Sequence, residues 1–159
     1  MGFKSVILVV EDVIKSRKLY EEILGCKVDG DFGIYNVGFE GGLSLYKKSF
    51  FAEMINNVDI VSRAHNLAVY FEFDDIFSLR DTVIKSDFEL VHDIKEQPWG
   101  QNLFRFYDYD KHIIEVAENM NTVLKNMYEN GMSLIMISDK SGYPVEEVTR
   151  ILQELKVIV

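Results

Sequence analysis

An internal repeat constrains the fold of this chain of 159 residues more than any other feature of its sequence. When Asp12 is laid on Asp75, an offset of 63 residues, Val28 falls on Val91. In each copy an apolar run precedes an acidic residue, and a segment with helical spacing follows it. Three short strand-like segments complete each copy, separated by glycine-rich or acidic turns. The sequence therefore predicts an α+β fold of two tandem βαβββ units.

The two copies divide the chain into modules and a tail. We assign residues 1–118 to one domain, with modules at 1–48 and 66–118 and a linker at 49–65 that carries a short helix. Residues 119–159 have glycine-punctuated helical spacing and are predicted to form a short C-terminal helical tail. Within the modules, strands are predicted at 6–10, 26–29, 33–39, 43–47, 67–73, 88–92, 103–107 and 113–117, and helices begin after Asp12 and Asp75.

Motifs at the start of the first module and at the end of the second carry a family resemblance. They are Val9-Val10-Glu11-Asp12 with Leu24-Gly25, and then residues 97–101, 104–108 and 112–116. In this order they resemble the vicinal-oxygen-chelate superfamily of glyoxalases, extradiol dioxygenases and bleomycin-resistance proteins, and within it a small bacterial glyoxalase-like subgroup with a helical tail. The resemblance implies two modules that form a cup-shaped mixed sheet. It also implies a homodimer, because superfamily members commonly dimerise.

Superfamily enzymes hold a divalent metal with one side chain from each of four strands, and the matching positions here are poor in ligands. The resemblance places Ser5, Leu45, Ala68 and Glu115 at these positions. The Glu115 carboxylate is the one competent ligand, since leucine and alanine cannot coordinate a metal and a neutral serine binds it weakly. We therefore expect no cofactor, and in particular no divalent metal of the family type.

Strand alternation gathers polar side chains on the expected cup face. Counted back from the hairpin turn, Arg105 lies opposite Glu115. Tyr70 and Glu72 share one face of the second module's first strand, and Trp99 lies in a turn that the family places over the cup mouth. A few polar groups in a mostly apolar pocket are typical of a small-molecule site, so these five residues are our predicted ligand contacts. The alternatives are that Arg105 and Glu115 neutralise each other in a filled cup, and that Trp99 anchors the hairpin.

Composition and charge argue against several classes of partner. Seventeen Lys and Arg residues against 26 Asp and Glu residues give a net charge of -9, which repels phosphate backbones and makes nucleic acid an unexpected partner. No apolar run approaches the roughly 18–20 residues that cross a bilayer, so no membrane partner is expected. The single cysteine, Cys26, cannot form an internal disulfide, which fits a reducing, cytoplasmic setting.

The tail resembles a helix-turn-helix segment in its spacing but not in its charge. Gly142-Tyr143-Pro144 supplies the expected turn, and the following helix begins Val145-Glu146-Glu147. Such a helix would present two carboxylates to the phosphates of a DNA groove. We expect the tail to pack on its own domain or on a partner subunit.

Three interpretations of function remain open. The leading one is a glyoxalase/bleomycin-resistance-like protein that binds a small organic molecule in the cup without the family's usual metal centre. If the chain is an enzyme, the alternative is a metal-dependent lyase resembling lactoylglutathione lyase, or a dioxygenase, with Glu115 as a ligand. The third is a regulator that senses a ligand through the cup and acts through the helix-turn-helix-like tail.

Overall fold

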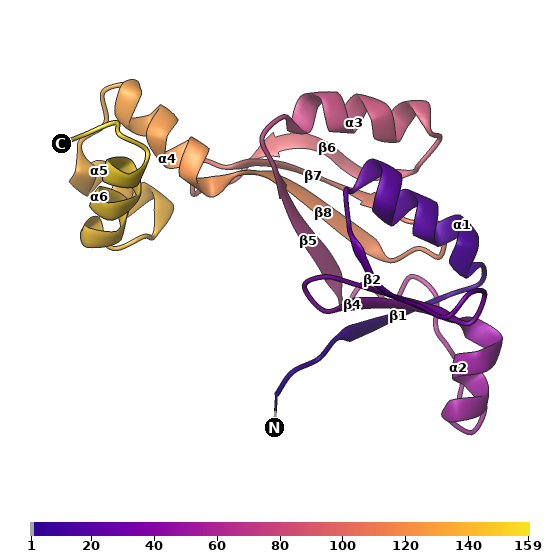
Figure 1. The fold of residues 1–159 in the computed structure, drawn as a ribbon. Helices are drawn as coiled ribbons and strands as arrows, with labels where there is room; N and C mark the ends of the chain where they lie inside the picture. The colour runs from indigo at the N-terminus through magenta and orange to yellow at the C-terminus, as the bar shows by residue number, and fades with distance from the viewer. Residues whose placement is uncertain (1) are drawn as a thin grey trace.

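Two four-stranded mixed sheets form the body of the protein, as the computed structural model, which describes residues 2–159, shows in Figure 1. The first sheet has the strand order β1-β4-β3-β2 and the second has the order β5-β8-β7-β6. In each sheet the first strand of the module pairs in parallel with the last, and the other neighbours are antiparallel. The shared order confirms the α+β fold predicted from the repeat.

The first module begins with a strand and a capped helix. The Asp12 carboxylate accepts a hydrogen bond from the Lys15 amide at 3.0 Å, which satisfies one of the unpaired amides of the first helical turn. The helix then widens into a π-helical turn, and Gly25 follows it in the left-handed conformation. The elements are β1 (Val6–Val10), α1 (Val13–Lys18), η1 (Leu19–Ile23), β2 (Val28–Asp31), β3 (Asn36–Phe39), β4 (Leu43–Lys47) and the linker helix α2 (Lys48–Met54).

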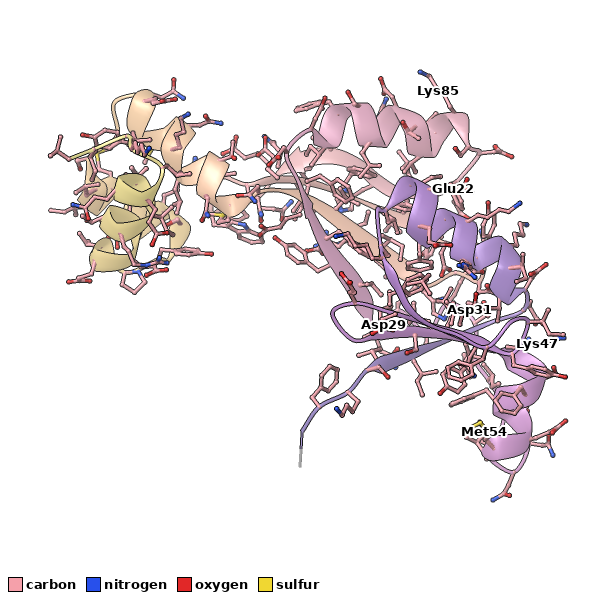
Figure 2. All side chains as sticks on the ribbon, in the orientation of Figure 1. Glu22, Asp29, Asp31, Lys47, Met54 and Lys85 are labelled. Carbon is pink, nitrogen blue, oxygen red and sulfur yellow. The ribbon has the colours of Figure 1, made fainter. Side chains whose placement is uncertain are left out.

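The second module repeats this construction. Asp75 caps its helix by accepting from the Ser78 amide at 3.0 Å, as Asp12 does in the first module. Figure 2 shows Lys85, at the end of this helix, pointing away from the sheets. The elements are β5 (Ala68–Phe73), α3 (Ile76–Lys85), β6 (Leu90–Glu96), β7 (Asn102–Tyr107) and β8 (Ile113–Glu118).

The main differences from the predicted elements lie in β2, β3 and β6, and the strand predicted at 33–39 begins only at Asn36. The strand predicted at 26–29 begins at Val28 and runs to Asp31, so the segment around Gly30 is part of β2 and not a turn. An irregularity in the β2–β3 register between Val28 and Gly30 accommodates it. The carboxylate of Asp31 pairs with Arg17 of α1 at 2.7 Å, which ties this edge strand to the helix. Likewise β6 extends to Glu96, four residues beyond the predicted strand at 88–92.

The helix-facing sides of both sheets share one hydrophobic core. Leu8, Leu45 and Tyr20 of the first module belong to the same buried cluster as Phe104 and Ile114 of the second. Each of these five side chains is at most 1% exposed. The remaining face of each sheet points away from its helix and from this core, and we call it the cup face. Its side chains alternate along the strands with those of the core.

Buried polar contacts join the hairpin of the second module to the first helix. The Asp108 carboxylate, 1% exposed, accepts from the Tyr20 hydroxyl at 3.1 Å and pairs with Nδ1 of His112 at 2.8 Å. Two residues on, Asp110 accepts from the Glu11 amide at 2.9 Å. Because unpaired buried carboxylates are costly, these bonds fix the position of one module against the other.

The tail forms a bundle of its own beyond the end of the second sheet (Figure 1). Its core is a separate buried cluster that includes Leu124, Ile137 and Leu152. The helices are α4 (Met120–Glu129), α5 (Leu134–Ser141) and α6 (Val145–Glu154). Among residues 2–159, no helix combines the length and the apolar character that a membrane crossing requires.

The contacts of His112 predict a pH-dependent stability. Burial of the imidazole opposes protonation, but its bond to Asp108 and the nearby charges outweigh burial and raise the pKa of His112 above its usual value of 6.5. The folded state therefore holds this proton more tightly than the unfolded state does. The resulting stabilisation is complete below about pH 6.5 and is lost as pH rises through the raised pKa. His112→Gln should thus lower the free energy of unfolding more at about pH 5.5 than at about pH 9, as measured by urea denaturation.

A second variant separates titration from simple loss of a bond. Tyr20→Phe removes a hydrogen bond to the same carboxylate without removing a group that titrates in this range, because burial keeps the pKa of Tyr20 well above 10. Its destabilisation, about 1–2 kcal/mol, should be the same at both pH values. A His112→Gln effect that is equally independent of pH would contradict the assignment.

Candidate functional site on the cup face of the second sheet

A row of polar side chains crosses the cup face of the second sheet. The register pairs Tyr70 of β5 with Glu115 of β8, and Glu115 with Arg105 of β7. The Arg105 guanidinium donates from Nε to Glu115 Oε2 at 2.6 Å and approaches Nε2 of His92 on β6 at 2.8 Å. Four neighbouring strands thus contribute one side chain each. We call Tyr70, Glu115, Arg105 and His92 the polar row.

The contacts of His92 define its protonation. A guanidinium can only donate, so Nε2 of His92 must be the acceptor in its contact with Arg105. The proton then lies on Nδ1, which donates to the backbone carbonyl of Asp93 at 2.8 Å. A neutral imidazole and a carboxylate therefore hold the guanidinium from two sides. This arrangement fixes the direction of Arg105 before any ligand arrives.

A second polar network adjoins the row. The Tyr70 hydroxyl donates to Glu72 Oε1 at 2.8 Å and accepts from Gln101 Nε2 at 3.0 Å. The Gln101 side-chain oxygen in turn accepts from the Trp99 indole at 2.9 Å. Tyr70 is 48% exposed. Partial burial of its hydroxyl, and then the neighbouring Glu72 carboxylate, raise the pKa of Tyr70 to about 12. Tyr70 is therefore a neutral hydrogen-bond donor over the physiological range.

The structure brings three of the five predicted ligand contacts into one cavity. Tyr70, Glu72 and Trp99 line a cavity of about 260 Å³, and Arg105 and Glu115 lie in the polar row beside it. The row is not packed shut, since the side chains of Arg105 and Glu115 are 29% and 18% exposed. The indole of Trp99 both lines the cavity and bonds to its own turn, so both proposed roles of this residue are compatible with its position.

The four metal positions expected from the resemblance bring one strong ligand to the cup face. Leu45 was expected on the cup face, but it is fully buried in the core, because β4 pairs Leu45 with Leu8 on the helix-facing side. The cup-facing neighbours of Leu45 are Ser44 and Tyr46. Ser5 lies just before β1 and Ala68 opens β5, so Glu115 remains the one strong ligand, and Arg105 already pairs with it. Within residues 2–159, no three His, Cys, Asp or Glu side chains form a group that could hold a metal ion.

The cup face of the first sheet has different side chains at the positions equivalent to the polar row. Its register aligns Ile7, Ser44 and Gly38 where the second sheet has Tyr70, Glu115 and Arg105. The charged group nearest to this row is the Asp29 carboxylate, which fills the space beside Gly38, where a β-carbon would lie 2.9 Å from Oδ1 of Asp29. The duplicated fold therefore presents an Arg105–Glu115 ion pair on one cup face, and Ile7, Ser44 and Gly38 in the equivalent row of the other.

Two contributors to the site were not predicted from the sequence. His92 was assigned no role, because register shifts on both sides of it in β6 hide its alignment with Arg105. Gln101 was noted as part of a family motif only, yet it is 4% exposed and connects Tyr70 to Trp99. The position of Gln101, three residues after Pro98, gave no indication that its side chain connects Tyr70 to Trp99. Burial raises the pKa of the Cys26 thiol to about 11, which makes it a poor nucleophile near neutral pH.

The polar row predicts an asymmetric double-mutant cycle. Arg105→Met leaves the largely covered Glu115 carboxylate without its cation, so it should lower the free energy of unfolding by about 2 kcal/mol. Adding Glu115→Leu removes the unpaired charge and should restore most of that loss. Urea denaturation of both variants tests this. A double variant that is less stable than Arg105→Met would show that the pair is not the dominant contact of either side chain.

Comparisons with known proteins agree with this geometry. A family model described as a glyoxalase-like domain matches residues 3–121. A protein of unknown function from Agrobacterium tumefaciens is 36% identical over 75% of this chain and 94% of its own, with a TM-score of 0.66. A glyoxalase-related enzyme from Fulvimarina pelagi is 19% identical over 76% of this chain and 89% of its own, with a TM-score of 0.64.

More distant structures extend the same likeness. A lactoylglutathione lyase from Agrobacterium tumefaciens is 14% identical over 74% of this chain and 93% of its own, with a TM-score of 0.54. No curated protein matches the chain. The family model ends within α4, so the match covers both modules and leaves most of the tail outside it. Because the model spans well over half of the sequence, the chain belongs to the glyoxalase-like domain family of the vicinal-oxygen-chelate superfamily.

Proposed function

We propose that this protein binds a small organic molecule on the cup face of its second sheet, without the metal centre of the family's enzymes. The observation that carries the proposal is the polar row, in which Arg105 is held between Glu115 and His92 while remaining partly exposed. Binding sites of this kind combine preorganised polar groups with aromatic walls. Tyr70 and Trp99 supply such walls beside the row.

The arrangement favours binding over stability as the reason for the row. An ion pair of this kind contributes little to folding, because desolvation offsets much of the attraction between its charges. The first sheet has Ile7, Ser44 and Gly38 at the same positions and the same strand topology, so the ion pair is not required to build the fold. A guanidinium with donors left for a ligand and fixed in direction is suited to a carboxylate or carbonyl group.

The tail supports the binding interpretation more than the regulatory one. Arg150 of α6 is ion-paired with Glu147 at 2.6 Å and with Glu154 at 2.5 Å. Lys140 of α5 pairs with Glu96 of β6 at 3.0 Å. These cations are engaged by carboxylates, so the helix that would enter a DNA groove presents a predominantly acidic surface.

A calorimetric titration separates the binding proposal from the lyase or dioxygenase alternative. Chelator-treated protein titrated with Ni²⁺, Zn²⁺, Mn²⁺ and Fe²⁺ should show no one-site binding at micromolar concentrations, because a single carboxylate paired with Arg105 is a poor metal site. Micromolar metal binding that disappears in Glu115→Ala would favour the metal-dependent lyase or dioxygenase over the binding proposal.

The second arm of the same experiment is a small-molecule screen. Compounds that bind the wild type should bind Arg105→Ala at least about tenfold more weakly, the effect of losing one charged hydrogen-bonding partner. Arg80→Ala, which removes an arginine that pairs with Asp93 on the opposite side of β6, is the matched control and should retain affinity. Unchanged affinity in folded Arg105→Ala would contradict the role of Arg105.

We further propose that a second copy of the chain completes the cup. The cup face of the first sheet leaves Ile7 37% exposed, and the cup face of the second leaves Tyr70 48% exposed. A two-fold axis can place the first sheet of each copy over the second sheet of the other. The two equivalent contacts then cover the cup faces of all four sheets. This pairing would close the polar row against the first sheet of the partner copy.

Light scattering tests the proposed dimer. At micromolar concentration the mass should be twice the chain mass of 18.4 kDa. Ile7→Glu places a charge in the contact and should give a monomer, whereas Phe77→Glu, on the exposed side of α3, should leave the dimer intact. A monomeric wild type would rule out the shared cup.

A further inference from the structure

The cavity beside the polar row is built from four segments of the chain, one of which is Met120 at the start of α4. Tyr70 and Glu72 come from β5, and Trp99 and Gln101 come from the turn between β6 and β7. The third wall is the turn between α5 and α6 of the tail, which contributes Tyr143. The tail helices therefore form part of the cavity, although the family model ends before them.

Fixed contacts hold the tail against this cavity. Gly100 has a φ of +89°, and a β-carbon there would lie 2.2 Å from Cε of Met127 and 3.0 Å from Cε of Lys140. The absence of a side chain thus allows α4 and α5 to approach the turn that carries Trp99. The Lys140–Glu96 ion pair, at 3.0 Å, adds a second connection. These contacts hold the tail near the turn that carries Trp99, and Tyr143 lines the tail side of the cavity.

The residues that line the cavity carry negative charge only. Glu72 is the one carboxylate among the lining residues, and no Lys, Arg or His lines the cavity. Within residues 2–159, no cation lies within ion-pairing distance of Glu72, whose recorded partner is the neutral Tyr70 hydroxyl. The net charge of -9 adds a field that attracts cations. An anionic group is disfavoured here, and a cationic group is favoured.

The walls decide between an organic cation and a metal ion. One carboxylate and a few neutral oxygens are fewer strong ligands than a metal site requires. Aromatic faces, by contrast, attract alkylammonium groups through the ring quadrupole, most strongly where water is excluded. Tyr70, Trp99 and Tyr143 provide three such rings around Glu72. The volume of about 260 Å³ lies just below the range of sites for drug-sized ligands, so it suits a small head group.

We propose that this cavity binds an alkylammonium group of a small molecule, with Glu72 as the counter-ion, Tyr70 and Trp99 as aromatic walls, and Tyr143 of the C-terminal tail as the third wall. The inference rests on the proposed ligand site, because the cavity adjoins the polar row and shares Tyr70 with it. It assigns a chemical class to one end of the ligand and a binding role to the tail.

The test compares a cation with its uncharged shape analogue. Choline and 3,3-dimethyl-1-butanol have the same branched head but differ in charge, and each is titrated into the full chain by calorimetry or by ligand-observed NMR. We expect choline to bind and the neutral alcohol to bind at least tenfold more weakly. Equal binding of the two, or no binding of choline at a concentration of tens of millimolar, overturns the alkylammonium assignment.

Matched variants locate the binding. Glu72→Gln keeps the shape of the side chain and should weaken choline binding at least tenfold, whereas Glu53→Gln changes the net charge equally on the exposed surface of α2 and should not. Tyr143→Leu should weaken choline binding about three- to tenfold, and Tyr35→Leu, at an exposed tyrosine of the first module, should leave it unchanged. Choline affinity that is insensitive to both Glu72→Gln and Tyr143→Leu overturns the proposed site. Circular dichroism confirms that each variant is folded.

The outcomes distinguish this inference from the proposed function. A screened compound that loses affinity in Arg105→Ala but not in Glu72→Gln or Tyr143→Leu overturns the alkylammonium site and leaves the proposed function standing. In a second outcome, choline binding depends on Glu72 and Tyr143, but the screened ligands keep their affinity in Arg105→Ala. This result supports the alkylammonium site and removes Arg105 from the ligand contacts. No binding by any compound overturns both.

Discussion

The buried carboxylate of Asp108 is the contact on which the relation between the two modules depends. It is held by Tyr20 from the first helix and by His112 from its own hairpin, and the neighbouring Asp110 receives the backbone amide of Glu11. A hydrophobic core alone would not specify how the two modules are positioned relative to one another, since apolar contacts are not directional. Directional hydrogen bonds to a buried charge specify one docking arrangement, and that arrangement sets where each cup face points.

Duplication has produced two sheets of the same topology with different chemistry on their cup faces. The core side of each sheet is constrained by packing, and there the modules match, with apolar residues such as Leu8 and Phe104 fully buried. The cup side bears no such constraint. One copy has Ile7, Ser44 and Gly38 in this row, and the other has the Glu115–Arg105–His92 arrangement. The proposed site therefore lies on the second module, and fold membership alone does not define it.

The sequence was sufficient to predict the duplication, the two aspartate caps and the Arg105–Glu115 pair, because these follow from period-2 alternation and short-range hairpin geometry. It misplaced Leu45, since an apolar strand residue fits either face of a sheet and a one-residue shift reverses them all. His92 was missed because bulges break the alternation in β6. The contribution of Tyr143 depends on how the tail docks, which local patterns do not encode.

Gly100 carries a consequence for how this protein can be observed. It follows the chain's single tryptophan and lies in contact range of Met127 in α4 and Lys140 in α5. Any displacement of the tail bundle must alter the packing of that turn, and with it the surroundings of the Trp99 indole. The intrinsic fluorescence of the native chain is thus a built-in reporter on the seating of its C-terminal helices, with no label and no competing indole.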